Sequence, residues 1–250
     1  QKMKIISIVQ ARMNSNRLPG KILMKVNNKP MIDYLINRLK KINNLDEIVI
    51  STTKNKKDDV LIKHCIKKNY KYFRGSEKNV LKRVYQTAKK YKGTIILFIT
   101  GDCPIIDVKI IRKILNFYLI NKKKFDYVGN AFIRSFPDGM DAHVFSFSTL
   151  EKNYKLVKTS LEKEHVTLGI RSRPKKFRIK NIIASKTQFW PELGLTLDEK
   201  SDFDLIKKII LYFKKSKKYF FTCREILNLL RTKKREWVKI NSHVTRKGYN

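Results

Sequence analysis

The sequence has few cysteines and lacks any long apolar run. Its three cysteines, Cys65, Cys103 and Cys223, are widely separated and odd in number, which excludes a disulfide framework and matches no zinc-binding spacing. No apolar run approaches the roughly 18 residues that a membrane-spanning helix needs. The short apolar stretch near the amino end is not followed by the small-residue cleavage site of a signal peptide. These absences predict a cytoplasmic protein with no membrane insertion.

Acidic residues are scarce as well. The chain holds 21 Asp and Glu against 57 Lys and Arg, which gives a formal net charge of +36. Such a charge is typical of proteins that bind nucleic acid. The lysines, however, are spread over nearly every segment with helical spacing, and they accompany many Ile and Asn residues, as codon bias in an AT-rich gene would produce. Under either interpretation the charge attracts anionic partners, nucleotides included.

Apolar runs alternate with segments of helical spacing in the first half of the chain. The runs lie at 4–9, 47–51, 70–73, 94–99 and 126–129, and the helical segments between them lie at 30–42, 58–68, 80–91 and 108–120. Strands that alternate with such helices imply crossover connections. We therefore expect an α/β fold, a mostly parallel twisted sheet with helices on both faces.

The second half is patterned more loosely. We expect alternating aromatics after a turn at 135–147, a helix at 148–169, strands at 177–185 and 193–198, and helices at 202–215 and 223–231. No linker or repeat divides the chain, so we predict one domain at 3–232, followed by a basic and weakly patterned tail at 233–250 that could be mobile.

A polar segment, QARMNSNRLPGK at 10–21, follows the first apolar run. Open parallel sheets bind ligands beyond the carboxyl ends of their strands. There the turn formers can aim backbone N–H groups at phosphates, while Arg12, Arg17 and Lys21 neutralise charge. The segment has neither the Walker spacing nor a dinucleotide fingerprint. It predicts a polyphosphate cradle, with a basic surface turn and a nucleic-acid contact as alternatives.

Two aspartates each follow an apolar segment. Asp102 stands in ITGDCP, and Asp198 stands in LTLDEKSDFDL before a helix that Ser201 or Asp202 could cap. Mg²⁺ usually takes one or two carboxylates and completes its shell with water and substrate phosphates. Either aspartate could instead cap a turn. Together with the loop at 10–21 they form the set that nucleotidyl transfer needs, because that chemistry depends on positioning and electrostatics.

Six segments in one order carry a family resemblance. They are QARMNSNRLPGK, FRGSEKNVLKR, ITGDCPIID, FPDGMDAHVFS, EKEHVT and LTLDEKSDFDLI. They resemble the motifs of the cytidylyltransferase-type family of spore coat polysaccharide biosynthesis protein F and, more distantly, acylneuraminate and 3-deoxy-manno-octulosonate cytidylyltransferases. The resemblance implies a Rossmann-like fold of the nucleotide-diphospho-sugar transferase type, with a nucleotide-binding part at 3–130, an acceptor-side part at 131–200 and C-terminal helices at 201–232.

The same resemblance implies an activity. The enzyme would be a Mg²⁺-dependent nucleotidyltransferase that joins CMP from CTP to an acidic or phosphorylated sugar and releases pyrophosphate, for surface polysaccharide or glycan biosynthesis. Two rivals stay open: a glycosyltransferase, which also uses carboxylates and a divalent metal, and a non-catalytic nucleic-acid-binding protein. The residues do not define the acceptor, the nucleoside triphosphate or the oligomeric state, although relatives are often homodimers.

Residue roles are carried over by position. The catalytic residues would be Lys21, Arg12, Asp102 and Asp198, with Asp102 and Asp198 binding the metal. The nucleotide would be bound by Gln10, Ala11, Arg12, Met13, Arg17, Lys21, Thr52, Arg74, Gly75, Ser76, Arg83, Thr100 and Gly101. The acceptor would be bound by Asp138, Gly139, Asp141, His143, Glu164 and His165.

Three positions depart from the family pattern. Asn14 replaces the usual Gly, and we expect the turn to survive because Asn tolerates left-handed backbone angles. Gly194 replaces an Arg and removes an anchor. His143 replaces a Glu and introduces a group that can be neutral or cationic. Both His143 and His165 also have a purely structural interpretation.

Overall fold

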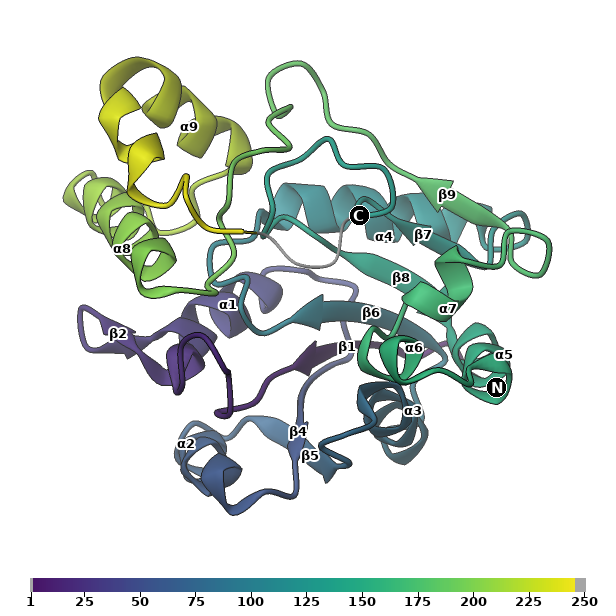
Figure 1. Ribbon diagram of the computed structural model, residues 1–250. Coiled ribbons are helices and arrows are strands. Elements are labelled where there is room, and N and C mark those ends of the chain that lie inside the picture. Colours follow the sequence, from purple (N-terminus) through teal and green to yellow (C-terminus); the bar gives the residue numbers. More distant parts are fainter. Residues whose placement is uncertain (1, 246–250) are drawn as a thin grey trace.

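The computed structural model describes residues 2–245, and its centre is one seven-stranded sheet with the strand order β5-β4-β1-β6-β8-β7-β9 (Figure 1). The strands are β1 (Ile5–Gln10), β4 (Glu47–Thr53), β5 (Lys71–Gly75), β6 (Ile95–Thr100), β7 (Tyr127–Gly129), β8 (His143–Ser146) and β9 (Ile179–Asn181). Strands β5, β4, β1 and β6 run parallel, β8 is antiparallel to both neighbours, and β9 is parallel to β7. The expected mostly parallel α/β sheet is confirmed.

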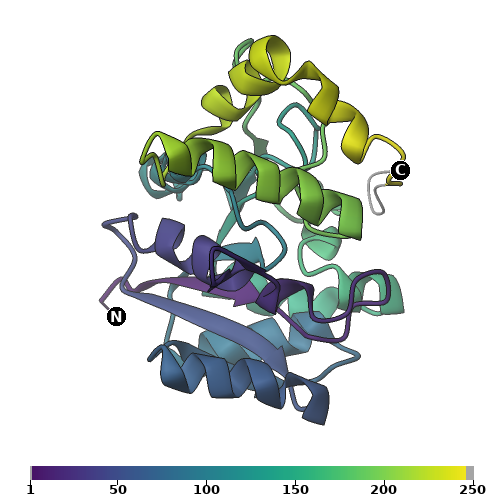
Figure 2. The same cartoon turned by 90° about the vertical axis from the view of Figure 1, so that its left-hand side faces the viewer.

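Helices cover both faces of the sheet, as the view in Figure 2 shows. One layer contains α1 (Met31–Leu39), α2 (Asp59–Lys67), α4 (Val108–Asn121), α8 (Lys200–Lys215) and α9 (Cys223–Asn228). The other contains α3 (Val80–Lys90), α5 (Phe147–Leu156), α6 (Ser160–Glu164) and α7 (Leu168–Arg171). Shorter elements are the hairpin β2 (Lys25–Val26) and β3 (Lys29–Pro30), η1 (Lys21–Leu23), η2 (Lys56–Asp58), the π-helix η3 (Leu229–Lys233) and η4 (Arg235–Ile240).

Strand β6 explains the two-sided core. Successive side chains of a strand point to opposite faces, so Leu97 and Ile99 pack with the α1 and α4 layer while Ile96 and Phe98 pack with the α3 and α5 layer. Both layers exclude water from β6, which is why this strand is apolar along nearly its whole length. Its carboxyl end, and that of β1 beside it, reach one edge of the sheet.

Two expected elements of the second half differ in the structure. The helix expected at 148–169 is divided, because Val157 is extended and Thr159 begins α6 with a capping box to Glu162. The strand expected at 193–198 is an extended segment with a single bridge, between Gly194 and Asp138. Its leucines alternate as in a strand, but its backbone bonds to loops, with the Leu197 N–H donating to the Asp102 carbonyl at 2.8 Å. The strand expected at 177–185 is confined to β9.

The basic tail is packed as far as the structure describes it. Trp237, Val238 and Ile240 contact the core beside α8, and Asn241 is only 3% exposed. The sequence predicted a weakly patterned tail at 233–250 that could be mobile. Residues 246–250 of this tail lie outside the described residues. Within the described part of the chain, no helix has the length and apolarity to cross a membrane.

Candidate active site

A cavity of about 640 Å³ opens beyond the carboxyl ends of β1 and β6. Many of the residues expected from the sequence line it: Gln10, Ala11, Arg12, Arg17, Lys21, Thr100, Gly101, Asp102, Asp138, Asp141, His143, Glu164, His165 and Asp198. They come from segments separated by up to about three quarters of the chain, and the topology of the sheet brings them to one edge. We call this cavity the catalytic cleft.

The ammonium group of Lys21 joins the two predicted aspartates. Its Nζ lies 3.1 Å from Asp102 Oδ2 and 3.0 Å from Asp198 Oδ1. Arg17 reaches the other oxygen of Asp198 at 3.0 Å and also pairs with Glu199 at 3.5 Å. Both carboxylates therefore face the same small volume, and two cations of the opening loop lie against them.

Burial and charge act in opposite directions at this cluster. Burial favours the neutral amine of Lys21, but the carboxylates of Asp102 and Asp198 outweigh it and raise the pKa of Lys21 above its ordinary value. Burial likewise favours the neutral acid of Asp102, yet the Lys21 charge, with a hydrogen bond from Thr100, lowers the pKa of Asp102. The charged forms persist because each offsets the other.

The carboxylate pair fits a magnesium ion. Among residues 2–245, no group of three or more His, Cys, Asp or Glu side chains is placed to hold a metal. Mg²⁺ does not need one, because it binds through one or two carboxylates and keeps water and substrate phosphates as its other ligands. Asp102 and Asp198 already share one cation, the Lys21 ammonium, so both carboxylates face the volume that a divalent ion would occupy.

The opening loop is held by backbone contacts. Asp58, almost fully buried, accepts from the Met13 N–H at 2.6 Å, and the Gly20 N–H donates to the Met13 carbonyl at 2.9 Å. Gly20 has φ +73°, in the left-handed region, whereas Asn14 is not among the described residues with positive φ. The turn is therefore formed without a left-handed conformation at Asn14, and Gly20 takes that conformation instead. Asn14 instead donates to Glu77 at 3.3 Å.

Close packing at the sheet edge explains Gly101. Its N–H donates to the Gln10 carbonyl at 2.7 Å, and a Cβ at this position would lie 2.9 Å from the Ala11 Cβ and 3.0 Å from the Gln10 carbonyl oxygen. Contacts this short are essentially absent from proteins. The glycine thus lets the loops after β1 and β6 meet, and it places Asp102 opposite Lys21.

Asp198 is supported by a second layer of hydrogen bonds. Asp202, fully buried in the first turn of α8, accepts from the N–H groups of Asp198 at 3.0 Å and Glu199 at 2.8 Å. The side-chain amide of Asn241 donates to the other oxygen of Asp202 at 2.7 Å and to the Gly194 carbonyl at 2.9 Å. Asp202 as a cap was foreseeable from the sequence. Asn241 was not, because no motif marks it.

Seven predicted site residues do not line the cleft: Met13, Thr52, Arg74, Gly75, Ser76, Arg83 and Gly139. Arg74 pairs with Asp59 at 2.7 Å and donates to the Thr53 and Asn55 carbonyls. Arg83 is fully buried, and burial, with the nearby Arg12 charge, lowers its pKa to about 10. Gly139, with φ +97°, packs on the Leu195 backbone. Their nucleotide and acceptor contacts stay predictions.

A smaller chamber of about 140 Å³ adjoins the cleft beside Glu164 and His165. The two cavities share Gln10, Thr100, His143, Glu164 and His165. The chamber adds Arg171, whose Nε is buried without a hydrogen-bond partner among the described residues. Arg171 ends α7 and was missed by the sequence analysis, since a single Arg in a basic chain gives no signal.

His143 is a neutral residue of this chamber. It is 8% exposed, and its Nδ1 lies 2.6 Å from the Tyr127 hydroxyl. Burial, with the nearby positive charge of Arg171, lowers the pKa of His143 to about 3. The structure therefore favours the neutral form over the cationic alternative at physiological pH.

Known proteins resemble this chain over nearly its whole length. A family profile described as cytidylyltransferase matches residues 6–232. The chain is 35% identical over 247 residues to an uncharacterised protein of Methanocaldococcus jannaschii, covering 99% of this chain and 98% of that one. It is 31% identical over 234 residues to the spore coat polysaccharide biosynthesis protein SpsF of Bacillus subtilis, covering 90% and 93%.

Solved structures show the same fold. A cytidylyltransferase from Leptospira borgpetersenii superposes with a TM-score of 0.88 at 29% identity, covering 98% of this chain and all of that one. A CMP-2-keto-3-deoxy-manno-octonic acid synthetase complexed with CTP superposes with a TM-score of 0.63 at 14% identity, covering 84% and 99%, a likeness of fold alone. The sequence match over residues 6–232 favours a nucleotidyltransferase over the two alternatives, a glycosyltransferase and a nucleic-acid-binding protein. The chain belongs to the cytidylyltransferase family.

Proposed function

We propose that the protein transfers CMP from CTP to an acidic or phosphorylated sugar, with Mg²⁺ and with release of pyrophosphate, in surface polysaccharide or glycan biosynthesis. The observation that carries the proposal is the contact of Lys21 with both Asp102 and Asp198 beside Arg17, beyond the carboxyl edge of the sheet. A cationic loop that faces two carboxylates suits a triphosphate together with a divalent metal. A protein that only binds polyanions would need the cations but not the carboxylates, which repel phosphate unless a metal ion lies between them.

Asp102 and Asp198 would hold the metal ion, which when bound offsets negative charge on the triphosphate. Arg12, Arg17 and Lys21 would bind the phosphate oxygens, and Arg17 and Lys21 would exchange their present carboxylate partners for phosphate. An acceptor oxygen attacks the α-phosphorus in line, so that a new oxygen–phosphorus bond forms while the bond from the α-phosphorus to the α,β-bridging oxygen breaks. That oxygen leaves with pyrophosphate, and an acceptor hydroxyl releases its proton to solvent. Lys21 and the arginines stabilise the charge that develops on the departing pyrophosphate.

The chamber beside the cleft supports an acidic acceptor. Arg171 presents a guanidinium to a space that opens from the cleft, and its buried Nε has no hydrogen-bond partner within residues 2–245. A buried polar group without a partner costs about 1–3 kcal/mol, and an anionic group of the acceptor would supply that partner. Glu164 and His165 lie between the chamber and the cleft, where they would contact acceptor hydroxyls.

The deciding experiment is a pyrophosphate-release screen. Four nucleoside triphosphates are paired with a panel of sugar acids and sugar phosphates, each with and without Mg²⁺, and every pair is repeated with Asp102→Asn. We expect release with CTP, an acidic acceptor and Mg²⁺, and none with the variant. Release that ignores Mg²⁺ or Asp102, or transfer of a sugar from a nucleotide-sugar without pyrophosphate, would contradict the proposal.

A further inference from the structure

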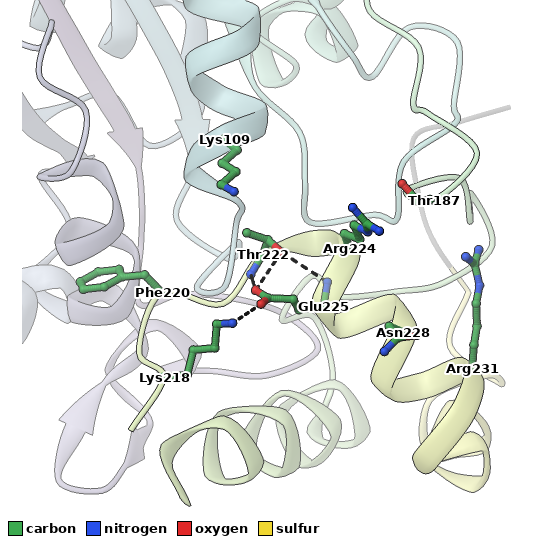
Figure 3. A pocket seen from close by; sticks show the side chains of 9 residues that line it. All are labelled: Lys109, Thr187, Lys218, Phe220, Thr222, Arg224, Glu225, Asn228 and Arg231. Carbon is green, nitrogen blue, oxygen red and sulfur yellow. Dashed lines mark hydrogen bonds and ion pairs between the residues drawn. The ribbon is translucent and has the colours of Figure 1, made fainter. Parts of the chain in front are cut away.

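A second cavity, of about 660 Å³, lies between the start of α4, the segment that leads into α9, and α9 itself (Figure 3). Its lining residues are Lys109, Thr187, Lys218, Phe220, Thr222, Arg224, Glu225, Asn228 and Arg231. None of them lines the catalytic cleft or its side chamber. Its volume is within the range of about 300–1,000 Å³ that is typical of small-molecule sites.

The lining is strongly cationic. Four of its residues are Lys or Arg, and Glu225 is its one acidic residue. That carboxylate is already engaged, because one oxygen pairs with Lys218 and the other accepts from the Thr222 N–H at 2.8 Å and hydroxyl at 2.9 Å. Within residues 2–245, neither Lys109 nor Arg224 has an ion-pair partner. The cavity therefore holds positive charge that no carboxylate of the described chain offsets.

The donors are arranged on fixed elements. Arg224, Asn228 and Arg231 follow the i, i+4, i+7 spacing along α9 and η3, which puts them on one helical face. Arg231 is held in place, since it donates to the Phe189 carbonyl at 2.7 Å and lies 5.1 Å from the centre of the Trp190 ring. Lys109 extends from the first turn of α4 toward Thr222 on the opposite wall (Figure 3).

Asp107 fixes the two walls relative to each other. One of its oxygens accepts from the Lys109 N–H at 2.7 Å and caps α4, and the other accepts from the Cys223 N–H at 2.8 Å. Asp107 is 2% exposed. The cations thus stand on elements that are joined before any ligand arrives, and such preorganisation reduces the entropy cost of binding.

We propose that this cavity is a second anion site, which binds a small molecule carrying two or more phosphate groups. Cations on both walls suit an anion that extends across the space, because a single phosphate on one wall leaves the other unpaired. Arg and Lys with neighbouring hydroxyl and amide donors are the groups that bind phosphate oxygens. The site goes beyond the proposed transferase reaction, whose triphosphate binds at the cleft.

Inorganic pyrophosphate is the probe that tests the site, in calorimetric titrations of the full chain without Mg²⁺. Lys109→Ala/Arg224→Ala removes the two unpaired cations and leaves both backbone contacts of Asp107 intact. We expect it to weaken one class of pyrophosphate site by about tenfold or more, as the loss of charge-assisted hydrogen bonds predicts. The variant Arg17→Ala/Lys21→Ala removes two cations from the catalytic cleft, and it should still bind pyrophosphate at the second cavity. Pyrophosphate binding there would therefore be detected even if the proposed transferase activity were absent.

The matched control is Lys63→Ala/Lys82→Ala, which removes two exposed lysines from α2 and α3, outside every cavity described above. It should bind pyrophosphate as the wild type does, and inorganic phosphate should bind the cavity more weakly than pyrophosphate. Equal weakening in the control would mean that only the general +36 field attracts the anion, and the proposal fails. It also fails if the cavity variant loses binding of a short oligonucleotide but not of pyrophosphate.

Discussion

The Asn241 side-chain amide donates a hydrogen bond to Asp202 across 2.7 Å, and through Asp202 the C-terminal segment supports Asp198, which lines the cleft. Both partners are buried, at 3% and 0% exposure. The residues that would bind the metal and phosphates come from the sheet edge, but the hydrogen bonds that fix one of them extend to Asn241 in the C-terminal segment. Groups behind a ligand in this way typically change metal affinity or activity by about 10–100-fold when they are removed.

Asn241→Ala should therefore impair the reaction without touching substrate. Loss of the amide removes the hydrogen bond from Asn241 to Asp202 and loosens the turn at Asp198. We expect the Mg²⁺ concentration for half-maximal rate to rise and kcat to fall by about tenfold, with a lower melting temperature. Titration of the initial rate with Mg²⁺ measures the first effect, which a purely structural role would leave unchanged.

Ser242→Ala is the control for that experiment, because Ser242 is exposed and its hydroxyl donates to the nearby Lys239 carbonyl. It should keep the wild-type Mg²⁺ dependence. If Asn241→Ala melts at a lower temperature but retains the same Mg²⁺ dependence, Asn241 stabilises the fold and does not position Asp198.

Asp102→Asn tests the metal role directly. The amide is nearly isosteric with the carboxylate, so the fold and melting temperature should change little. The charge that would bind Mg²⁺ is lost, and activity should fall by at least two orders of magnitude, the range seen when a preorganised electrostatic group is removed. Steady-state rates beside a thermal melt measure both quantities; turnover near the wild-type level would refute the metal site.

Lys21→Ala separates binding from chemistry. In the proposed reaction its ammonium would face the charge that develops on the departing pyrophosphate, so it should stabilise the transition state more than bound CTP. We expect kcat to fall by more than the affinity for CTP does, measured as single-turnover rates against direct CTP binding. A variant that loses CTP affinity and keeps kcat at saturation would show that Lys21 only holds the substrate.

Arg171→Ala tests the acceptor chamber. The guanidinium is expected to pair with an anionic group of the acceptor, and such a charged hydrogen bond contributes about 1.5–3 kcal/mol. The KM for the acceptor should therefore rise by about 10–100-fold, while the KM for CTP stays constant. Arg171→Lys should restore part of the lost acceptor affinity. The control Lys175→Ala, at an exposed neighbouring site, should have the wild-type KM for the acceptor. Equal changes in both KM values would contradict the assignment.

The half of the site on the regular part of the fold could be predicted from the sequence. Strands β1 and β6 are apolar along their length, so their ends are visible in the sequence and Asp102 is placed by its position after β6. Parallel pairing then brings these ends to one edge. Lys21 could be placed near that edge because it stands on the connection that leaves β1.

The irregular half could not be predicted in the same way. Residues 193–198 alternate like a strand, yet their backbone bonds to Asp102 and Asp138 in loops, and no local pattern reports such long-range partners. Arg171 is one of many cations, and its place in the chamber, with a buried Nε that has no hydrogen-bond partner among residues 2–245, becomes visible only in the folded structure. Asn241 lies in a tail whose composition gave no sign of packing.

His143 predicts a specific pH dependence of stability. Burial, with Arg171, lowers its pKa in the folded protein to about 3, whereas an unfolded chain has a His pKa near about 6.5. Between these values the unfolded chain binds a proton that the folded protein does not. Stability contributed by neutral His143 is therefore fully present above pH about 6.5 and is lost as pH falls toward 3, with a slope of up to about 1.4 kcal/mol per pH unit.

The variant His143→Gln cannot titrate at this position, so its free energy of unfolding should depend less steeply on pH by that amount. Free energies of unfolding from urea titrations between pH 7 and pH 4.5, compared for the two proteins, measure the difference; parallel curves would mean that His143 takes up its proton equally well in both states.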